Sequence, residues 1–303
     1  MNLPTLAQQN EALSTTAAEI EKTVKQDNPL KEEPELESTS HSIPMPTPRI
    51  EQHKKDIKHY LPTKNVKPLL VGSNDYLTLI TEYKTINSKG VAILLPDWQQ
   101  GATNPKAINF LRKELPQHGW TTVSIQPDSI PENYPSSALT KEEKLKENHS
   151  ILKNYKEKFG TLINSLIDKA NDYPGIVLII AQGNHGAMVV DLLNKEKKEP
   201  VILQSPNALV LLSSYVLTNN IFVDESNKAF AKTIANSDYP ILDLYLRHDN
   251  PIVVNKAKQR LSMSKQAMKV YFRQRQLNNS AMGYYPETEL ISQINRWIKS
   301  IGW

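Results

Sequence analysis

The chain has 303 residues, of which 39% are hydrophobic and 22% are charged, a composition typical of globular domains with a substantial core. It contains no cysteine, which excludes disulfides, thiolate metal ligands and a cysteine nucleophile. The net charge of +4 is unevenly spread, since residues 1–60 carry 10 acidic and 7 basic side chains. No dense Lys/Arg run with interleaved aromatics occurs, so a nucleic-acid partner is not expected.

Residues 1–68 are expected to form a disordered or low-complexity N-terminal tether. Residues 8–65 combine Glu, Lys, Ser, Thr and Pro with few aromatics, so this part lacks the apolar surface needed to order itself. Residues 1–7 are interpreted as the remnant of a signal peptide, because Leu3–Ala7 resembles the end of a secretory signal. An ordinary disordered start is the alternative. The first interpretation predicts an upstream start codon and a periplasmic protein, and the second leaves the protein cytoplasmic.

From residue 69 to residue 303, short apolar runs alternate with amphipathic ones, which is typical of parallel strands joined by helices. The expected strands are 76–84, 90–95, 120–126, 175–180, 200–204, 241–247 and 268–275. The expected helices are 105–117, 141–171, 187–195 and 290–301, and residues 207–238 predict a helical, cap-like insertion. No window approaches 18 apolar residues, so no transmembrane segment is expected. The fold class is α/β, with a doubly wound, mostly parallel sheet.

The turn after the most apolar strand has the context of a nucleophile elbow, in which Gly-x-nucleophile-x-Gly joins a strand to a helix. In Ala181–Ala187 (Ala-Gln-Gly-Asn-His-Gly-Ala), Gly183 stands where the nucleophile belongs. Residues 176–190 contain no Ser, Thr, Cys or Asp, so no alignment supplies a nucleophile. The pattern predicts an α/β-hydrolase-like domain with a degenerate elbow at Gln182, Gly183, Asn184 and His185 and no catalytic residues.

The other two members of a catalytic triad give an independent test. The acid and then the histidine follow the nucleophile in this fold, the histidine coming after the last strand. Asp249 stands near the acid position, but no histidine follows His248, so Asp249 is interpreted as a vestigial acid. Asp249-Asn250-Pro251 also favours a turn that caps the following helix.

Several residues around this turn are candidates for binding a ligand. Asp97 and Trp98 follow the strand whose loop normally supplies an oxyanion-hole amide, although a surface loop with a buried indole is the alternative. His185 lies in the first turn of a helix, where the dipole favours a neutral packing role over catalysis. The ligand-binding candidates are Asp97, Trp98, Gln182, His185 and Asp249. No histidine pair has metal-ligand spacing and no Gly-rich phosphate loop occurs, so no metal or cofactor is expected.

Three segments resemble the bacterial domain-of-unknown-function 3530 family, whose members are similar to α/β hydrolases. They are Gly90–Trp98, Ala181–Ala187 and Tyr271–Arg275, and the resemblance covers about residues 70–303 in the hydrolase-like chain order. It implies an α/β-hydrolase-like fold and export from the cytoplasm, but no reaction.

The favoured interpretation is a pseudoenzyme, a non-catalytic module of the bacterial envelope that binds a protein partner or a small ligand. The alternative is a divergent hydrolase of esters, thioesters or amides in which Asp97, Asp249 or His185 activates water. A third interpretation is a scaffold whose partner binds residues 8–65. The elbow also predicts a positive φ at Gly183, which glycine tolerates, so that Gly183→Ser would lower stability by about 1–2 kcal/mol.

Overall fold

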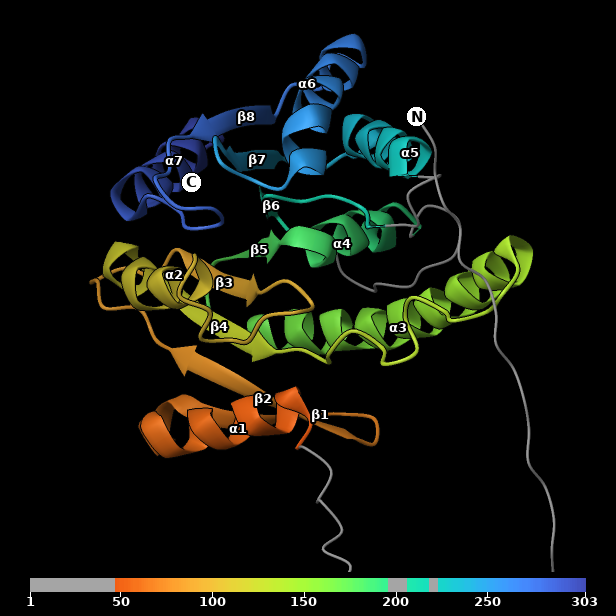
Figure 1. Ribbon diagram of the computed structural model, residues 1–303. Helices are drawn as coiled ribbons and strands as arrows, with labels where there is room; N and C mark the ends of the chain where they lie inside the picture. The colour runs from red at the N-terminus through yellow and green to blue at the C-terminus, as the bar shows by residue number, and fades with distance from the viewer. Residues whose placement is uncertain (1–46, 196–205, 218–222) are drawn as a thin grey trace, which may run out of the picture. The chain divides into compact units, whose positions relative to one another are not determined.

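A computed structural model describes residues 47–195, 206–217 and 223–303 (Figure 1). The interpretation of residues 1–7 as a signal remnant, most of the predicted tether and the strand predicted at 200–204 lie outside the described residues.

The core of the fold is one eight-stranded sheet. Its strands are β1 (Val66–Val71), β2 (Asn74–Thr81), β3 (Gly90–Leu95), β4 (Trp120–Gln126), β5 (Ile176–Gln182), β6 (Ala208–Leu212), β7 (Ile241–Leu246) and β8 (Phe272–Leu277). They lie in the order β1-β2-β4-β3-β5-β6-β7-β8. The strand β2 pairs antiparallel with both β1 and β4, and all pairs from β4 to β8 are parallel. The predicted α/β fold class is therefore confirmed.

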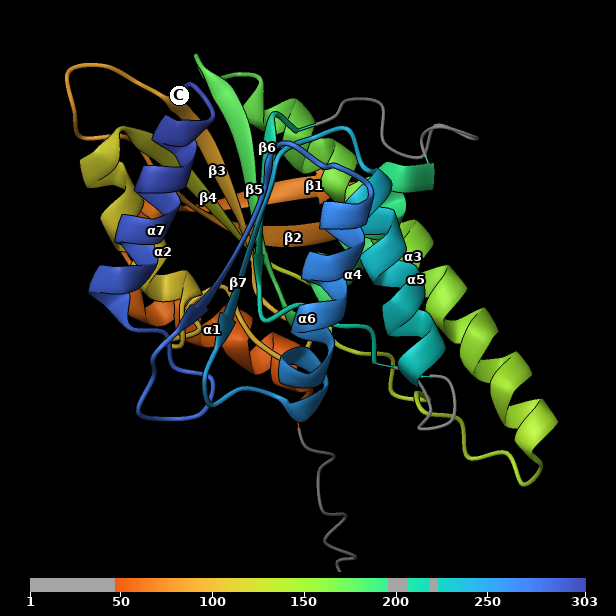
Figure 2. The same ribbon diagram turned by 90° about the horizontal axis from the view of Figure 1, so that it is seen from above.

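Helices cover both faces of this sheet. They are α1 (Arg49–Tyr60), α2 (Ile108–Glu114), α3 (Lys141–Ala170), α4 (Gly183–Lys195), α5 (Val223–Asn236), α6 (Pro251–Gln266) and α7 (Glu287–Ser300), with short 3₁₀ helices at Thr63–Asn65 and Leu115–His118. Figures 1 and 2 show α3, α4, α5 and α6 on one face and α2 and α7 on the other. Among the described residues, no helix has the length and apolar composition that a bilayer-spanning segment needs.

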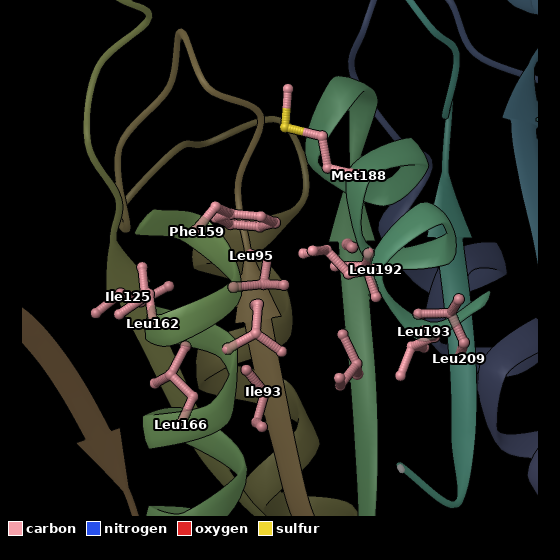
Figure 3. Packing of buried hydrophobic residues seen from close by; sticks show 14 of the residues in the cluster. Ile93, Leu95, Ile125, Phe159, Leu162, Leu166, Met188, Leu192, Leu193 and Leu209 are labelled. Carbon is pink, nitrogen blue, oxygen red and sulfur yellow. The ribbon is translucent and has the colours of Figure 1, made fainter. Parts of the chain in front are cut away.

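The central strands are apolar on both sides because both faces are covered. In β3, Ile93 and Leu95 pack with α3 and α4, whereas Ala92 and Leu94 pack with α2 and α7. Figure 3 shows Phe159, Leu162 and Leu166 of α3 beside Ile93 and Leu95 of β3, with Met188 and Leu192 of α4 close by. This packing holds the start of α4 at the carboxyl end of β5.

The long helix α3 begins at a side-chain cap. The Thr140 hydroxyl accepts a hydrogen bond from the Glu143 backbone N–H at 3.2 Å and donates to the Glu143 carboxylate at 2.7 Å, an arrangement that satisfies a free donor at the helix start. Behind the cap, the buried stripe Tyr155, Phe159, Ile163 and Leu166 recurs at helical spacing. The apolar stripe is the signal by which the sequence predicted this helix to within one residue.

The ordered domain begins earlier than residue 69. The described residues from 47 onward form one compact unit, and α1 lies within it because Ile57, 3% exposed, packs against Leu77, Leu79 and Ala102. The assignment of residues 47–68 to a disordered tether is therefore corrected. A single buried isoleucine in a polar helix produces no apolar stripe, so periodicity did not reveal it.

The segment 207–238 also differs from the expected helical cap. Residues Ala208–Leu212 form β6, which pairs with β5 and β7 inside the sheet, and Val223–Asn236 forms α5. A run of five apolar residues fits a buried strand or a buried helix equally well in sequence. In the folded chain this run pairs with β5, and it is therefore a strand.

Candidate functional site

The strand β5 leads directly into α4 through a sharp turn at Gly183. Its φ is +59°, in the left-handed region that glycine adopts without the steric cost of a Cβ. The turn sits at the carboxyl ends of the parallel strands, where ligands bind in open α/β sheets. The chain therefore retains the backbone of a nucleophile elbow without the nucleophile.

Asp97 holds the space that a nucleophile side chain would take. It follows β3 in the loop after Pro96, and its side chain reaches the elbow. A Cβ built on Gly183 would lie 2.4 Å from Cγ of Asp97 and 2.6 Å from each carboxylate oxygen. These distances are far below van der Waals contact, so the glycine at 183 and the carboxylate of Asp97 depend on each other.

The carboxylate of Asp97 also accepts hydrogen bonds from the backbone N–H groups beside the elbow. Oδ1 of Asp97 accepts hydrogen bonds from the backbone N–H of Asn184 and from that of Trp98, both at 2.9 Å. One donor follows the elbow residue and the other lies in the loop after β3, the two places that supply an oxyanion hole in α/β hydrolases. A carboxylate oxygen of the chain itself thus sits where such a hole would bind a substrate oxygen.

The environment of Asp97 changes its protonation. Burial raises the pKa of this carboxyl to about 6, while the backbone N–H groups of Asn184 and Trp98 act in the opposite direction. The ordinary value is 3.8, so the folded protein holds this proton more tightly than the unfolded chain. The stability contributed by the protonated form is fully present below pH 3.8 and is lost as the pH rises through about 6.

A variant that cannot ionise should lack this pH dependence. We expect Asp97→Asn to match the wild type at about pH 4 and to exceed its free energy of unfolding by roughly 2 kcal/mol at about pH 8, a value reduced for the partial exposure of Asp97. Urea unfolding of both proteins across this range measures the difference. Asp75→Asn, at an exposed carboxylate, is the control. A difference between Asp97→Asn and wild type that stays constant with pH would contradict the prediction.

His185 packs behind the elbow. The side chain is fully buried and stacks on Phe159, with 4.5 Å between ring centroids. Nδ1 lies 2.6 Å from the Pro96 carbonyl oxygen, and Nε2 lies 2.8 Å from the Tyr155 hydroxyl. Burial lowers the pKa of His185 to about 4, so the ring is neutral, Nδ1–H donates to Pro96 and Nε2 accepts from Tyr155. This geometry ties the loop after β3 to α3 and α4.

Asp249 belongs to a second polar cluster. Its Oδ2 accepts from the Leu246 backbone N–H at 2.9 Å and from the Ser213 hydroxyl, which also contacts the hydroxyl of Tyr285. Ser213 has a φ of +48°, unusual for a residue with a side chain. Asn250, the next residue, caps α6 by accepting from the Ile252 backbone N–H at 2.9 Å. Asp249 therefore holds the ends of β6 and β7 together.

The loop after β8 presents Tyr285 where a hydrolase of this chain order would present its histidine. The phenol is 5% exposed, and burial followed by the nearby Asp249 charge raises its pKa well above the ordinary range. It stays protonated and cannot act as a base at neutral pH. Ser213, Asp249 and Tyr285 therefore form a polar bridge between loops, without the histidine that would complete a catalytic triad.

A groove of about 840 Å³ opens beside the elbow between α3, α4 and α5. Trp98 and Asn184 line it at the elbow, and Leu152, Met188 and Phe230 contribute apolar surface. This volume lies within the range of small-molecule sites. Within the part of the chain that the structure describes, no group of three or more His, Asp or Glu side chains is placed to hold a metal ion.

The structure thus separates the residues that the sequence grouped as candidates. Asp97 and Trp98 meet the elbow at Gly183 and Asn184. Gln182 instead accepts a hydrogen bond from Asn104 Nδ2 at 3.2 Å. His185 lies behind the elbow and Asp249 lies in the second cluster. Three residues around the site were not predicted from the sequence, because they stand in no motif and reach their partners only through the fold: Tyr155, Ser213 and Tyr285.

Solved structures similar to this one define its class. Esterase 2 of Thermogutta terrifontis, phosphoramylated by tabun, superimposes with a TM-score of 0.55 at 12% identity, covering 80% of this chain and 97% of that one. Est1E from Butyrivibrio proteoclasticus, with ferulic acid bound, gives 0.53 at 11% identity over 77% and 98%. An alpha-beta serine hydrolase homologue from Coxiella burnetii gives 0.50 at 12% identity over 80% and 100%. At such identities these likenesses show the fold, which is that of the α/β hydrolases.

Comparison of the sequence with family models identifies the family. The family model described as Protein of unknown function (DUF3530) matches residues 3–300. The chain belongs to this family, as the resemblance of its strand and elbow segments predicted. None of the curated protein sequences matches it.

Proposed function

We propose that this chain is a non-catalytic α/β-hydrolase-like module of the bacterial envelope, which binds a small ligand in the groove beside its elbow. The observation that carries the proposal is the position of Asp97. Its carboxylate lies within 2.6 Å of the place where a nucleophile's Cβ would stand, and its Oδ1 accepts from both backbone donors beside the elbow.

The groups that acyl transfer requires are either missing here or already occupied. A nucleophile needs a hydroxyl, thiol or carboxylate at position 183 and a base within reach of it, but position 183 is glycine and His185 is turned away toward Pro96 and Tyr155. An oxyanion needs free donors, but the carboxylate of Asp97 uses them. A negative charge at this point would repel the developing oxyanion of a tetrahedral intermediate.

The groove supports the proposal that this chain binds a small ligand although it does not catalyse a reaction. It combines apolar surface with a few polar side chains and lies at the carboxyl ends of the strands, the usual location of ligand sites in this class of sheet. The envelope location rests on the family resemblance and on the signal-like segment Leu3–Ala7. Recovery of the chain in the cytoplasmic fraction of its host would remove that part of the proposal.

One observation favours the alternative, a divergent hydrolase. Asp97 combines partial exposure with a pKa raised to about 6 by burial, and a carboxylate of this kind in a crevice is a general-base candidate. In that mechanism Asp97 would take a proton from water, and its hydrogen bonds to Asn184 and Trp98 would have to open first.

A substrate screen separates the two functions. Chromogenic ester, thioester and anilide substrates are incubated with the purified chain, with Asp97→Asn and with the Asp75→Asn control. We expect hydrolysis at the rate of buffer alone in all three. Turnover above buffer in the wild type that is lost in Asp97→Asn and kept in Asp75→Asn would establish the hydrolase and overturn the proposal.

A further inference from the structure

We infer that a second pocket, at the amino ends of the strands, binds the phosphate group of a phosphate monoester. The pocket has a volume of about 590 Å³ and lies between the loop that precedes β3 and the C-terminal half of α7 (Figure 2). None of its lining residues lines the groove beside the elbow. The inference therefore goes beyond the proposed function and does not depend on it.

The lining of this pocket concentrates positive charge. Lys89, Arg296 and Lys299 line it together with His118. The residues of the lining all belong to the described part of the chain, and none of them is Asp or Glu. From outside the lining, Glu114 approaches His118, with 3.4 Å between carboxylate oxygen and Nε2. The two lysines and the arginine thus have no carboxylate among the pocket residues, and several like charges around one cavity favour an anion.

The helix α7 presents its polar residues to the pocket on one face. Ser292, Asn295, Arg296 and Lys299 line the pocket and recur at the spacing i, i+3, i+4 and i+7, which places them on the same side of a helix. Trp297, 1% exposed, anchors the opposite side in the core. Packing of α7 therefore fixes the direction of this face.

Lys89 comes from the other wall of the pocket. Its backbone is fixed one residue before β3, where its N–H donates to the Gly119 carbonyl at 2.8 Å and its carbonyl accepts from the Ile176 N–H at 3.0 Å. The residue is half-buried. Burial lowers the pKa of its ammonium group, and the charge of Lys299 lowers it further. An anion between the two lysines would oppose both effects. The position of Lys299 in the last turn of α7 is favourable for the helix dipole, but the dipole does not account for Lys89.

A phosphate monoester matches these donors better than a carboxylate does. It carries about −1.5 to −2 charges at pH 7 and three strong acceptor oxygens, compared with a single charge on a carboxylate. The guanidinium of Arg296 offers paired N–H donors to such a group, and the ammonium groups of Lys89 and Lys299 offer further ones. The volume of about 590 Å³ is within the range of small-molecule sites, so the body of the ligand fits beside its phosphate.

One apolar side chain at the pocket leaves two sources for the phosphate group. Ile86 lines the pocket and is 99% exposed. An exposed isoleucine beside cations is typical of a surface that contacts anionic lipid, in which case the phosphate belongs to a headgroup. A soluble phosphate monoester would use the pocket without Ile86. The phosphate chemistry is the same for both, and the experiment separates them.

Two soluble probes test the inference. Glycerol 3-phosphate and glycerate both have a three-carbon polar body, and one ends in a phosphate monoester and the other in a carboxylate. Each is titrated into the full, isotope-labelled chain at low ionic strength and about pH 7.5, where the phosphate is mostly dianionic, and followed by two-dimensional NMR. We expect glycerol 3-phosphate to shift the backbone resonances of Asn87 and Lys89 and the side-chain amide of Asn295, and glycerate to bind about tenfold more weakly.

Two double variants that remove the same charge locate the binding. Arg296→Gln with Lys299→Gln removes two exposed cations of the pocket, and Lys258→Gln with Lys265→Gln removes two exposed cations of α6 outside it. We expect the first variant to bind glycerol 3-phosphate at least about tenfold more weakly than the wild type, and the second to bind it within about twofold. Equal losses in the two variants would mean that net charge, and not the pocket, attracts the anion.

Vesicles distinguish the two sources of the phosphate. Sedimentation is measured with phosphatidylcholine vesicles that contain either no phosphatidic acid or about 20% of it, since phosphatidic acid exposes a phosphate monoester. Binding to the second kind of vesicle that is lost in Ile86→Ser and in the pocket variant would assign the phosphate to a lipid headgroup. Binding of glycerol 3-phosphate that Ile86→Ser leaves unchanged, without vesicle binding, would assign it to a soluble molecule. Binding of neither probe, glycerate binding as tight as that of glycerol 3-phosphate, or equal losses in the two double variants would overturn the inference.

Discussion

Replacing Gly183 by alanine is expected to lower the free energy of unfolding by about 3–5 kcal/mol, with two separable causes. A Cβ at a φ of +59° costs about 1–2 kcal/mol in the left-handed region. The same atom would lie 2.4 Å from Cγ of Asp97, so that carboxylate must leave the backbone donors of Asn184 and Trp98. The two N–H groups are then left without this acceptor, which adds roughly 2–3 kcal/mol.

A double-mutant cycle separates the two causes. In an Asp97→Ala background the clash is absent, and Gly183→Ala should cost only the backbone term of about 1–2 kcal/mol. Urea unfolding of the four proteins gives a coupling of about 2 kcal/mol between positions 97 and 183. Additive effects would mean that Asp97 does not fill the elbow in solution. Gly183→Ser meets the same clash with Asp97, so its expected cost rises from the roughly 1–2 kcal/mol predicted from sequence to about that of the alanine variant. It should hydrolyse no ester, because His185 faces Pro96 and Tyr155.

Removing the carboxylate of Asp243 is expected to destabilise the fold by about 3–5 kcal/mol. Asp243 on β7 is fully buried and Arg260 on α6 is 1% exposed. Oδ2 of Asp243 accepts from Arg260 Nε and from Gln274 Nε2, each at 2.7 Å. Asp243→Leu leaves the guanidinium of Arg260 buried without its counter-charge, which is costly. Denaturant unfolding monitored by circular dichroism measures the loss.

The matched control removes both charges. Asp243→Leu combined with Arg260→Met replaces the pair by apolar side chains of similar size, which proteins often tolerate with little loss. We expect the double variant to regain most of the stability lost in Asp243→Leu. If Asp243→Leu alone cost less than about 1 kcal/mol, or if the double variant were the less stable of the two, the pair would not hold the guanidinium as its geometry indicates.

Much of the sheet was predictable because its signals are local. The strands Gly90–Leu95 and Trp120–Gln126 were predicted with the bounds that the structure shows, since continuous apolar runs bounded by turn residues identify buried strands. The same approach failed for α1 and β6. The helix α1 buries a single isoleucine. The strand β6 is a short apolar run, and whether such a run forms a strand or a helix depends on its neighbours in the sheet.

The sequence by itself determined that position 183 cannot supply a nucleophile. Residues 176–190 contain no Ser, Thr, Cys or Asp, and no histidine follows His248, and residue identity is enough for both conclusions. Only the tertiary structure decided what fills the elbow, because Asp97 and Asn184 are 87 positions apart in the chain and meet only when β3 and β5 pair side by side. A side chain's reach is a few ångströms, so its partners follow from strand pairing and helix packing, which spacing along the chain does not encode.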